Sequence, residues 1–368
     1  MSNGVDAGKE QNDPRKNDYA VVVGVSRYPK LTRAGGGPAD LDGAINDARK
    51  VREWLERDDG GGVPPENVEY VVRQKATPAV TPDPTRDTIV QAFAEMYKRC
   101  WQPNGAPIVP LGRRLYVYVS GHGVASLDHG ALLCSNSSNA AFASVGPHLS
   151  IAAFRQAGFF KEFVVWFDGC MDWHGFEPEP INYNPKPGNS LTPPGPIFTG
   201  YAAHPRLQTV EAPDPDGEVH GIFTQTLLRG LEGGAADPET GVIDGFSLQN
   251  YLVNTLPKYL PDNVKNNNLV DKQPFVRTDP GIVFGTAKKV PLSTIVLQFG
   301  AQYDGAEARV WRGKPGVAGL SLISNQAITN GVAKFTLTNG IYAVDVPQHG
   351  LRTGFEVTGG TATKLMLA

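Results

Sequence analysis

Hydrophobic positions along the first two thirds of the chain follow two patterns that alternate. Residues 19–26 (YAVVVGVS) form a continuous apolar run rich in β-branched residues. A run that is apolar on both faces predicts a buried strand of a parallel sheet. Residues 42–57 instead carry apolar side chains at helical spacing among charged ones, which predicts an amphipathic helix. The first two elements are therefore a strand and a helix.

The same alternation continues to about residue 231. We expect further buried strands at 68–72, 115–120, 163–167 and 198–203, a short extended piece at 131–134, and helices at 85–97, 151–157 and 223–231. Strands that alternate with helices predict an α/β fold, in which a mainly parallel sheet is flanked by helices. Sites in such folds form at the carboxyl ends of the strands.

From about residue 290 the hydrophobic pattern changes. Short apolar runs without a helical period are separated by Gly, Asn and Asp turns, at 295–299, 308–311, 319–323, 332–337 and 341–346. This pattern predicts a small all-β sandwich domain at the C-terminal end. We therefore expect three regions: a polar tail at 1–17, an α/β domain at 18–287 and a β-sandwich domain at 288–368.

Composition narrows the class of protein. The formal net charge of −3 over 368 residues gives no basic footprint, so we expect no nucleic-acid partner. No apolar run is long enough to span a bilayer, and the first eighteen residues lack the apolar core of a signal peptide. Three scattered cysteines suit neither a disulfide framework nor a zinc site and are typical of a reducing compartment. We expect a cytoplasmic protein with no membrane span, metal or other cofactor.

Two predicted strands end in residue types suited to nucleophilic catalysis. The strand at 115–120 leads into Gly-His-Gly, centred on His122, and the strand at 163–167 leads into Asp-Gly-Cys, ending at Cys170. A thiolate attacks acyl groups, and a nearby imidazole can take the thiol proton and later protonate the leaving amine. We predict a catalytic pair of these two side chains, with the backbone amides of Gly123 and Cys170 as donors to the oxyanion.

Each of these residues also has a structural interpretation. A cysteine after a buried strand is commonly a buried thiol, and a histidine in a glycine turn is commonly a loop residue, but matching positions at two strand ends favour catalysis. Cys100 and Cys134 fit packing better. Five other histidines lie in predicted loops and are interpreted as bystanders, with only His174 near enough in sequence to reach the site: His129, His148, His174, His204 and His220.

Five short motifs occur in one order along the chain: YAVVVGV (19–25), GAINDA (43–48), SGHG (120–123), DGC (168–170) and GIFTQTLL (221–228). Together they resemble the caspase-like peptidases of clan CD (the C14 family), with bacterial caspase homologues and metacaspases as the nearest branch. The resemblance covers roughly residues 18–285. It implies the caspase–haemoglobinase fold and peptide-bond hydrolysis through an acyl-enzyme at Cys170.

The resemblance also implies a pocket for the substrate residue just before the cleaved bond (the P1 residue). Metacaspases line this pocket with residues that match Asp47, Ser120 and Asp168. Two carboxylates in a partly closed pocket bind a cation through charge-assisted hydrogen bonds, so we expect cleavage after Arg first and Lys second. The alternatives are an ordinary first-turn helix charge for Asp47 and a turn-stabilising carboxylate for Asp168. The stretch around Gln208 and Glu211 is a further candidate wall.

The chain departs from the family after the nucleophile. Residues 170–175 read Cys-Met-Asp-Trp-His-Gly where the family often has Cys-His-Ser-Gly, so we expect a remodelled loop with Trp173 and His174 near the cleft. Calcium-activated metacaspases use several Asp residues beyond the His, whereas here only Asp128 and Glu162 lie between Gly123 and Phe167. Because calcium needs six to eight oxygen ligands, we expect no calcium requirement.

The proline-rich stretch at 176–196 occupies the place where caspases are cut between their two subunits. Its only basic residue is Lys186, which Pro187 follows, and a following proline usually blocks cleavage. A peptidase specific for basic residues should leave this stretch intact, so we predict a single-chain enzyme.

Two other classes of function compete with this prediction. The first is a scaffold or binding protein on the same fold, with the catalytic pair unused and the C-terminal β domain recruiting partners. The second is another α/β hydrolase or a nucleotide-binding protein, but neither a G-x-S-x-G nor a P-loop sequence is present. Bacterial relatives often act in stress or anti-phage responses by cutting a partner protein, sometimes a pore-former, so the resemblance implies an effector or pore-forming protein as a partner.

Overall fold

The computed structural model describes most of the chain and divides it into two compact units. The units are Met1–Leu228 with Leu256–Ile282, and Arg229–Thr255 with Val283–Ala368. The described residues are 13–33, 36–73, 78, 80–126, 129–173, 181, 183, 194–214, 217–287, 292–313, 320–338, 340–357 and 363–366. The domain boundary expected between residues 287 and 288 stays a prediction.

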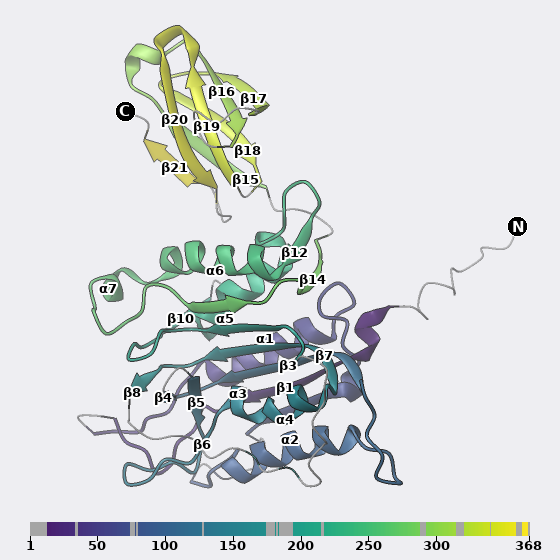
Figure 1. Cartoon of the computed structure of the whole chain (residues 1–368). Coiled ribbons are helices and arrows are strands. Elements are labelled where there is room, and N and C mark those ends of the chain that lie inside the picture. Colours follow the sequence, from purple (N-terminus) through teal and green to yellow (C-terminus); the bar gives the residue numbers. More distant parts are fainter. Residues whose placement is uncertain are drawn as a thin grey trace, which may run out of the picture. The chain divides into compact units, whose positions relative to one another are not determined.

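A six-stranded sheet forms the centre of the first unit (Figure 1). Its neighbouring strands are parallel, except that β13 runs antiparallel to β9. The central strands are almost entirely buried, which explains their continuous apolar runs. In spatial order the strands are β13 (Phe275–Thr278), β9 (Ile197–Tyr201), β7 (Phe160–Asp168), β3 (Gly112–Ser120), β1 (Asp18–Gly24) and β2 (Val68–Val72).

Helices cover both faces of this sheet because successive side chains of a strand point to opposite sides. On one face Val117 of β3 shares a core with Phe93 and Phe154, which lie on α2 and α4. On the other face Tyr116 packs edge-on against Trp54 of α1, with ring centroids 6.4 Å apart. The helices of the unit are α1 (Ala44–Glu56), α2 (Arg86–Arg99), α3 (Pro147–Ser150), α4 (Ala152–Ala157), α5 (Ile222–Arg229) and α7 (Asp262–Lys265).

Two small sheets extend the carboxyl edge of the large one. The first has the order β6-β5-β4-β8, and the second is the hairpin β10-β11. β4 starts directly after His122, and β8 starts two residues after Cys170, and these two strands pair in parallel. Their bounds are β4 (Gly123–Ser126), β5 (His129–Leu133), β6 (Ser144–Val145), β8 (Asp172–Trp173), β10 (Glu211–Pro213) and β11 (Val219–Gly221).

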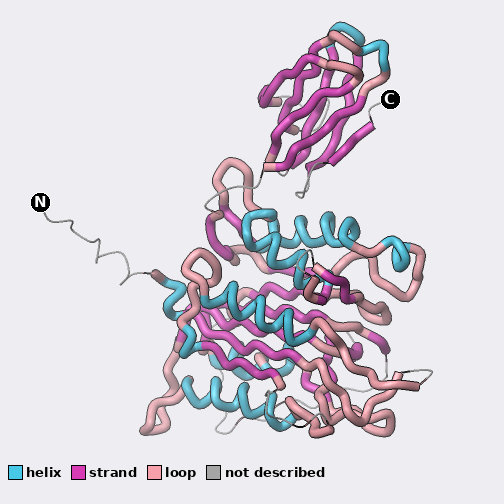
Figure 2. Tube along the Cα trace, turned by 180° about the vertical axis from the view of Figure 1, so that it is seen from behind, coloured by secondary structure: helices cyan, strands magenta, loops and turns pink. Residues whose placement is uncertain are grey.

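The second unit contains the β-sandwich predicted for the C-terminal end, and Figure 2 shows its strands. One sheet has the order β18-β15-β21 and the other β17-β16-β19-β20. Ile295, Val310, Phe335 and Val344 belong to the core between them. The strands are β15 (Ser293–Gln298), β16 (Glu307–Arg312), β17 (Ser321–Ala327), β18 (Val332–Leu337), β19 (Gly340–Val346), β20 (Leu351–Val357) and β21 (Thr363–Met366).

The fold class is therefore as predicted: an α/β fold with a mainly parallel sheet flanked by helices, together with a small β-sandwich. The pattern did not reveal the pair β12 (Val242–Asp244) and β14 (Val283–Thr286). It also did not reveal α6 (Gly245–Tyr259), whose helical spacing is interrupted by Pro257. Among the described residues, no helix is both long and apolar enough to cross a bilayer.

Candidate active site

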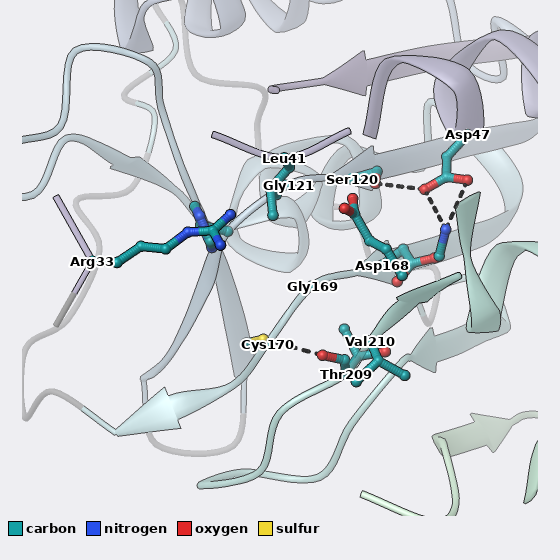
Figure 3. Close-up of a pocket in the computed structure, with 13 residues that line it drawn as sticks. Arg33, Leu41, Asp47, Ser120, Gly121, Asp168, Gly169, Cys170, Thr209 and Val210 are labelled. Atoms are coloured by element: carbon teal, nitrogen blue, oxygen red, sulfur yellow. Dashed lines mark hydrogen bonds between the residues drawn. The ribbon is translucent and has the colours of Figure 1, made fainter. Parts of the chain in front are cut away.

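The carboxyl ends of β3 and β7 border a pocket of about 260 Å³. Five of the six predicted site residues line it: Asp47, Ser120, His122, Asp168 and Cys170. In Figure 3 the side chains of Asp47, Ser120 and Asp168 gather at one side, and Arg33 approaches from the other. Asp47 and Cys170 are more than 100 positions apart in the sequence, so the fold brings them together.

Close backbone packing joins the two strand ends. Ser120 and Asp168 are direct neighbours in the ladder, and the amide of Gly121 donates to the carbonyl oxygen of Asp168 at 3.1 Å. Gly123 does not line the pocket, but a Cβ at this position would collide with the carbonyl oxygen of Cys170. Glycine at residue 123 is therefore what lets the histidine and cysteine segments approach each other.

The imidazole of His122 is held in one orientation by two contacts. Its Nε2 lies 2.6 Å from the carbonyl oxygen of Ala39. A carbonyl oxygen only accepts, so in the neutral ring Nε2 carries the proton and Nδ1 is unprotonated. The backbone amide of His122 donates to Tyr28 Oη at 2.8 Å, and the two rings are 4.8 Å apart. Nδ1 is therefore the atom of this residue that can accept a proton.

Cys170 differs from the other two thiols in its surroundings. It is half-buried, and its Sγ lies 3.8 Å from the carbonyl oxygen of Thr209, as Figure 3 shows. Cys100 and Cys134 are fully buried in the core, and burial raises the pKa of each to about 12. A thiol with so high a pKa is inert near neutral pH. Of the three cysteines, only Cys170 faces the pocket.

Asp47 is a buried carboxylate whose two oxygens are occupied by protein donors. Ser120 Oγ donates to Oδ2 at 3.2 Å, and His220 Nδ1 donates to Oδ1 at 3.0 Å. The amide of Gly221 lies 3.1 Å from both oxygens. Burial raises the pKa of Asp47, and the hydrogen bond from His220 opposes that rise. With 1% of its surface exposed, Asp47 is not a solvated charge in the first turn of a helix.

Asp168 is buried too, but only one of its oxygens is occupied. Thr224 donates to Oδ2 through its amide at 3.0 Å and its hydroxyl at 2.6 Å. The Oδ1 atom accepts from none of the residues that the structure describes. Burial raises the pKa of Asp168 to about 8, and the nearby charge of Asp47 adds to the effect. One carboxylate oxygen in this pocket is therefore left for a ligand.

A third carboxylate, Glu211, lines the pocket. It is one of the two residues predicted as a further wall of the pocket. The amides of Asp42 and Gly43 donate to Glu211 at 3.2 and 3.0 Å, while burial raises its pKa. Gln208 is not among the lining residues. Three carboxylates around one small space favour a cationic ligand.

Sequence reasoning missed two residues of the site. His220, interpreted as a loop bystander, lies on β11 and bonds Asp47 from 173 positions away in sequence. Thr224, which belongs to the GIFTQTLL motif, was not singled out although it is the donor to Asp168. Trp173 lies in β8, while His174 and the stretch at 184–193, with Lys186, lie outside the described residues. Within the described chain, no group of three or more His, Cys, Asp or Glu is placed to hold a metal ion, and calcium independence stays a prediction.

Comparison with known proteins finds a probable protease and two caspases among the proteins similar to this chain. No protein-family model matches the chain. A probable protease of a Desulfuromonadales bacterium is 30% identical over 227 residues, which are 59% of this chain and 26% of that protein. The match thus spans about a quarter of the relative's length.

Solved structures similar to the chain include two caspases. Caspase-1 from Spodoptera frugiperda is 12% identical with a TM-score of 0.42, covering 75% of this chain and 95% of that one. The Drosophila initiator caspase Dronc is 11% identical with a TM-score of 0.39, covering 76% and 87%.

Proposed function

We propose that this chain is a cysteine endopeptidase that cleaves protein substrates after basic residues, Arg before Lys, through an acyl-enzyme. One observation carries the proposal: a single pocket is lined by His122 and Cys170, by the two buried carboxylates Asp47 and Asp168 and by the half-buried carboxylate Glu211. A nucleophile and a base next to a cation-binding space suit cleavage beside a positively charged side chain.

The first chemical step uses the thiol and the imidazole. Nδ1 of His122 takes the proton of Cys170 Sγ, and the thiolate forms a bond to the carbonyl carbon of the substrate. The imidazolium then gives this proton to the leaving amine as the peptide bond breaks. In the second step water attacks the thioester, His122 removes a proton from the water, and the acid product leaves as the thiol re-forms. The Ala39 carbonyl favours both steps because it keeps the proton of the neutral ring on Nε2.

The oxyanion of each step needs backbone donors, and we assign them to Gly123 and Cys170. The amide of Leu133 donates to the carbonyl of His122, so His122 and Leu133 form a hydrogen-bonded pair of the antiparallel ladder. Gly123 pairs with Leu132 at the next position, where the amide points away from the partner strand. The amide of Gly123 is thus not used by β5 and points to the side of β4 on which β8 and the Cys170 segment lie.

The three carboxylates have different parts in recognising the substrate. Asp168 offers the open Oδ1 atom, and Glu211 lines the same space, so these two contact the basic side chain. Asp47 is saturated by Ser120, His220 and Gly221 and acts through its charge. Arg is preferred because a planar guanidinium can donate to two carboxylates at once, whereas the Lys ammonium is a point charge.

Fluorogenic peptides ending in Arg, Lys or Asp test the proposal. We expect cleavage after Arg, weaker cleavage after Lys and no cleavage after Asp, with and without a chelator. Cys170→Ala should abolish it, whereas Cys134→Ala, which removes a buried thiol away from the pocket, should not. Cleavage only after Asp would refute the basic specificity, and cleavage by the Cys170→Ala chain would refute the nucleophile.

One observation favours the scaffold alternative. Strand β17 lies at the edge of its sheet, and along it Leu322 and Ile323 are about half exposed. An exposed edge strand can pair with another chain. Alkylation of Cys170 separates the two functions, because a catalytic thiolate reacts much faster than an unused thiol.

A further inference from the structure

His220 is a buried imidazole with one partnered and one unpartnered nitrogen. Only 2% of its surface is exposed. Its Nδ1 bonds the Oδ1 atom of Asp47 at 3.0 Å, whereas Nε2 has no hydrogen-bond partner among the described residues. Glu218 Oε2 is 3.6 Å from Nε2, too far for a hydrogen bond. The ring can therefore take a second proton at a site where a carboxylate is ready to stabilise it.

The hairpin β10-β11 explains why this histidine reaches the specificity pocket, by which we mean the space around Asp47, Asp168 and Glu211. Glu211 pairs with Gly221 across the hairpin, and Ala212 pairs with His220. A Cβ at Gly221 would collide with the carboxylate of Asp168. Glycine thus lets β11 lie against both aspartates, and His220 is the residue next to this contact.

Several charged groups lie near His220, and most of them are acidic. Those that the described structure places around it are Asp47 and Arg49 of α1, Glu211 of β10, Asp214 after β10, Glu218 before β11 and Asp168 of β7. The hydrogen bond to Asp47 raises the pKa of His220 above its ordinary value. Glu218 is 43% exposed and also bonds Arg49.

The state of His220 changes what the pocket offers to a cation. Every oxygen of Asp47 already has a protein donor, so Asp47 acts on a bound side chain only through its charge. With a neutral imidazole, the pair of Asp47 and His220 carries one negative charge. With an imidazolium the pair carries none. At protein-like dielectric values, one unit charge at this range changes the affinity for a cation by roughly tenfold or more.

We propose that His220 is a positioning residue of the specificity pocket that orients Asp47 and, by gaining a proton, weakens the binding of basic side chains. The inference deepens the proposed function and depends on it, because it names the group that tunes recognition of the basic residue. Protonation of His220 should therefore change substrate binding (KM) and not the chemistry of the catalytic pair.

Binding of benzamidine, a small amidinium, to the full chain carrying Cys170→Ala tests this without catalysis. Calorimetry between pH 5.5 and 8.5 should show affinity falling by roughly tenfold or more toward low pH. His220→Asn keeps a donor near the Nδ1 position but cannot take the charge. In that variant the number of protons coupled to benzamidine binding should fall by about one. The remaining pH dependence should come from Asp168. The same pH dependence in parent and variant would overturn the inference.

Two further measurements distinguish a failure of the inference from a failure of the proposed function. In the unsubstituted chain, NMR titration of the imidazole signals should show that benzamidine lowers the pKa of His220, since linkage is reciprocal; an unchanged pKa would overturn the inference even if His220→Asn fails to fold. In the active chain, His220→Asn should change the pH profile of KM for Arg peptides and not that of kcat. If Arg peptides are cleaved and benzamidine binds without these effects, only the inference fails. If neither occurs at any pH, the proposed function fails with it.

Discussion

His122 Nε2 lies 2.6 Å from the carbonyl oxygen of Ala39, a residue 83 positions earlier in the chain. The loop after β1 therefore fixes which nitrogen of the imidazole carries the proton. A second contact from the same loop, Tyr28 Oη, accepts from the backbone amide of His122 at 2.8 Å. The base of the proposed mechanism is thus oriented by neutral groups, with no carboxylate on its ring among these contacts.

Replacing Tyr28 by Phe should lower kcat for Arg peptides by roughly tenfold while KM changes little. The substitution leaves the buried amide of His122 without an acceptor, which costs about 1–3 kcal/mol, and lets the imidazole shift from its productive orientation. Steady-state kinetics with an Arg peptide measure both constants. Tyr118→Phe is the matched control: its hydroxyl bonds Thr224, so we expect a higher KM and nearly the same kcat. Equal effects of the two variants on kcat would contradict the assignment.

Thr224→Val should weaken binding of Arg peptides at neutral pH. The hydroxyl of Thr224 donates to Asp168 and so favours the ionised form; without it, the pKa of Asp168 rises above about 8. A basic side chain must then displace a proton that is held more tightly, and each unit of pKa costs about tenfold in affinity. KM measured at pH 7 should rise, and the difference from the unsubstituted chain should shrink above pH 9, where Asp168 is ionised in both.

Thr226→Val provides the control for that experiment. Thr226 lies on the same helix and is equally buried, and among the described residues its hydroxyl bonds the carbonyl of Ile222 within the helix. We expect this variant to lose some stability and to leave KM unchanged at every pH. A similar rise of KM in both variants would mean that general loosening of α5, and not the charge of Asp168, is responsible.

Asp168→Asn should stabilise the fold increasingly as the pH rises. The folded-state pKa of about 8 lies above the unfolded value near 3.9, so the folded chain holds a proton that the unfolded chain has lost. The contribution of Asp168 to the free energy of unfolding is therefore fully present below about pH 4 and decreases as the pH rises toward 8. The neutral amide removes this loss, which amounts to a few kcal/mol at pH 9, or roughly 2–4 °C in Tm per kcal/mol.

Thermal melts at pH 5, 7 and 9 check this pH dependence. The gain in Tm for Asp168→Asn over the unsubstituted chain should grow across the series. Asp237→Asn should instead lower Tm by the same amount at all three pH values, because backbone amides of Thr240 and Glu239 lower the pKa of Asp237, so this carboxylate is ionised in the folded and the unfolded chain throughout the series. A gain for Asp168→Asn that does not depend on pH would mean that the carboxylate is ionised in the folded state throughout.

The predictable parts of this protein are those that bury long stretches of chain. The runs at 19–26 and 163–167 are apolar on both faces because helices cover both sides of the sheet, and the structure places strands there. β8 has only two residues, too few to show any period, so of the small sheet that continues from the two catalytic candidates only the extended piece at 131–134, within β5 and its end, was predicted. His220 bonds Asp47 over 173 positions, and no local pattern records such a contact.

The approach of the histidine and cysteine segments depends on the absence of a side chain at Gly123, and this dependence can be tested by substitution. A methyl group at residue 123 would meet the carbonyl oxygen of Cys170 and the ring of Phe167, neither of which can move freely in a buried sheet. Gly123→Ala should therefore abolish cleavage after Arg and lower Tm by several degrees, since overpacking costs about 1–3 kcal/mol. Gly146→Ala, where the nearest atoms are 3.3 Å or more away on the flexible side chain of Leu149, should keep activity and Tm nearly unchanged. Full activity in Gly123→Ala would show that the pair does not need the close packing of β4 against the cysteine segment, and the assignment of the Gly123 amide to the oxyanion would fail with it.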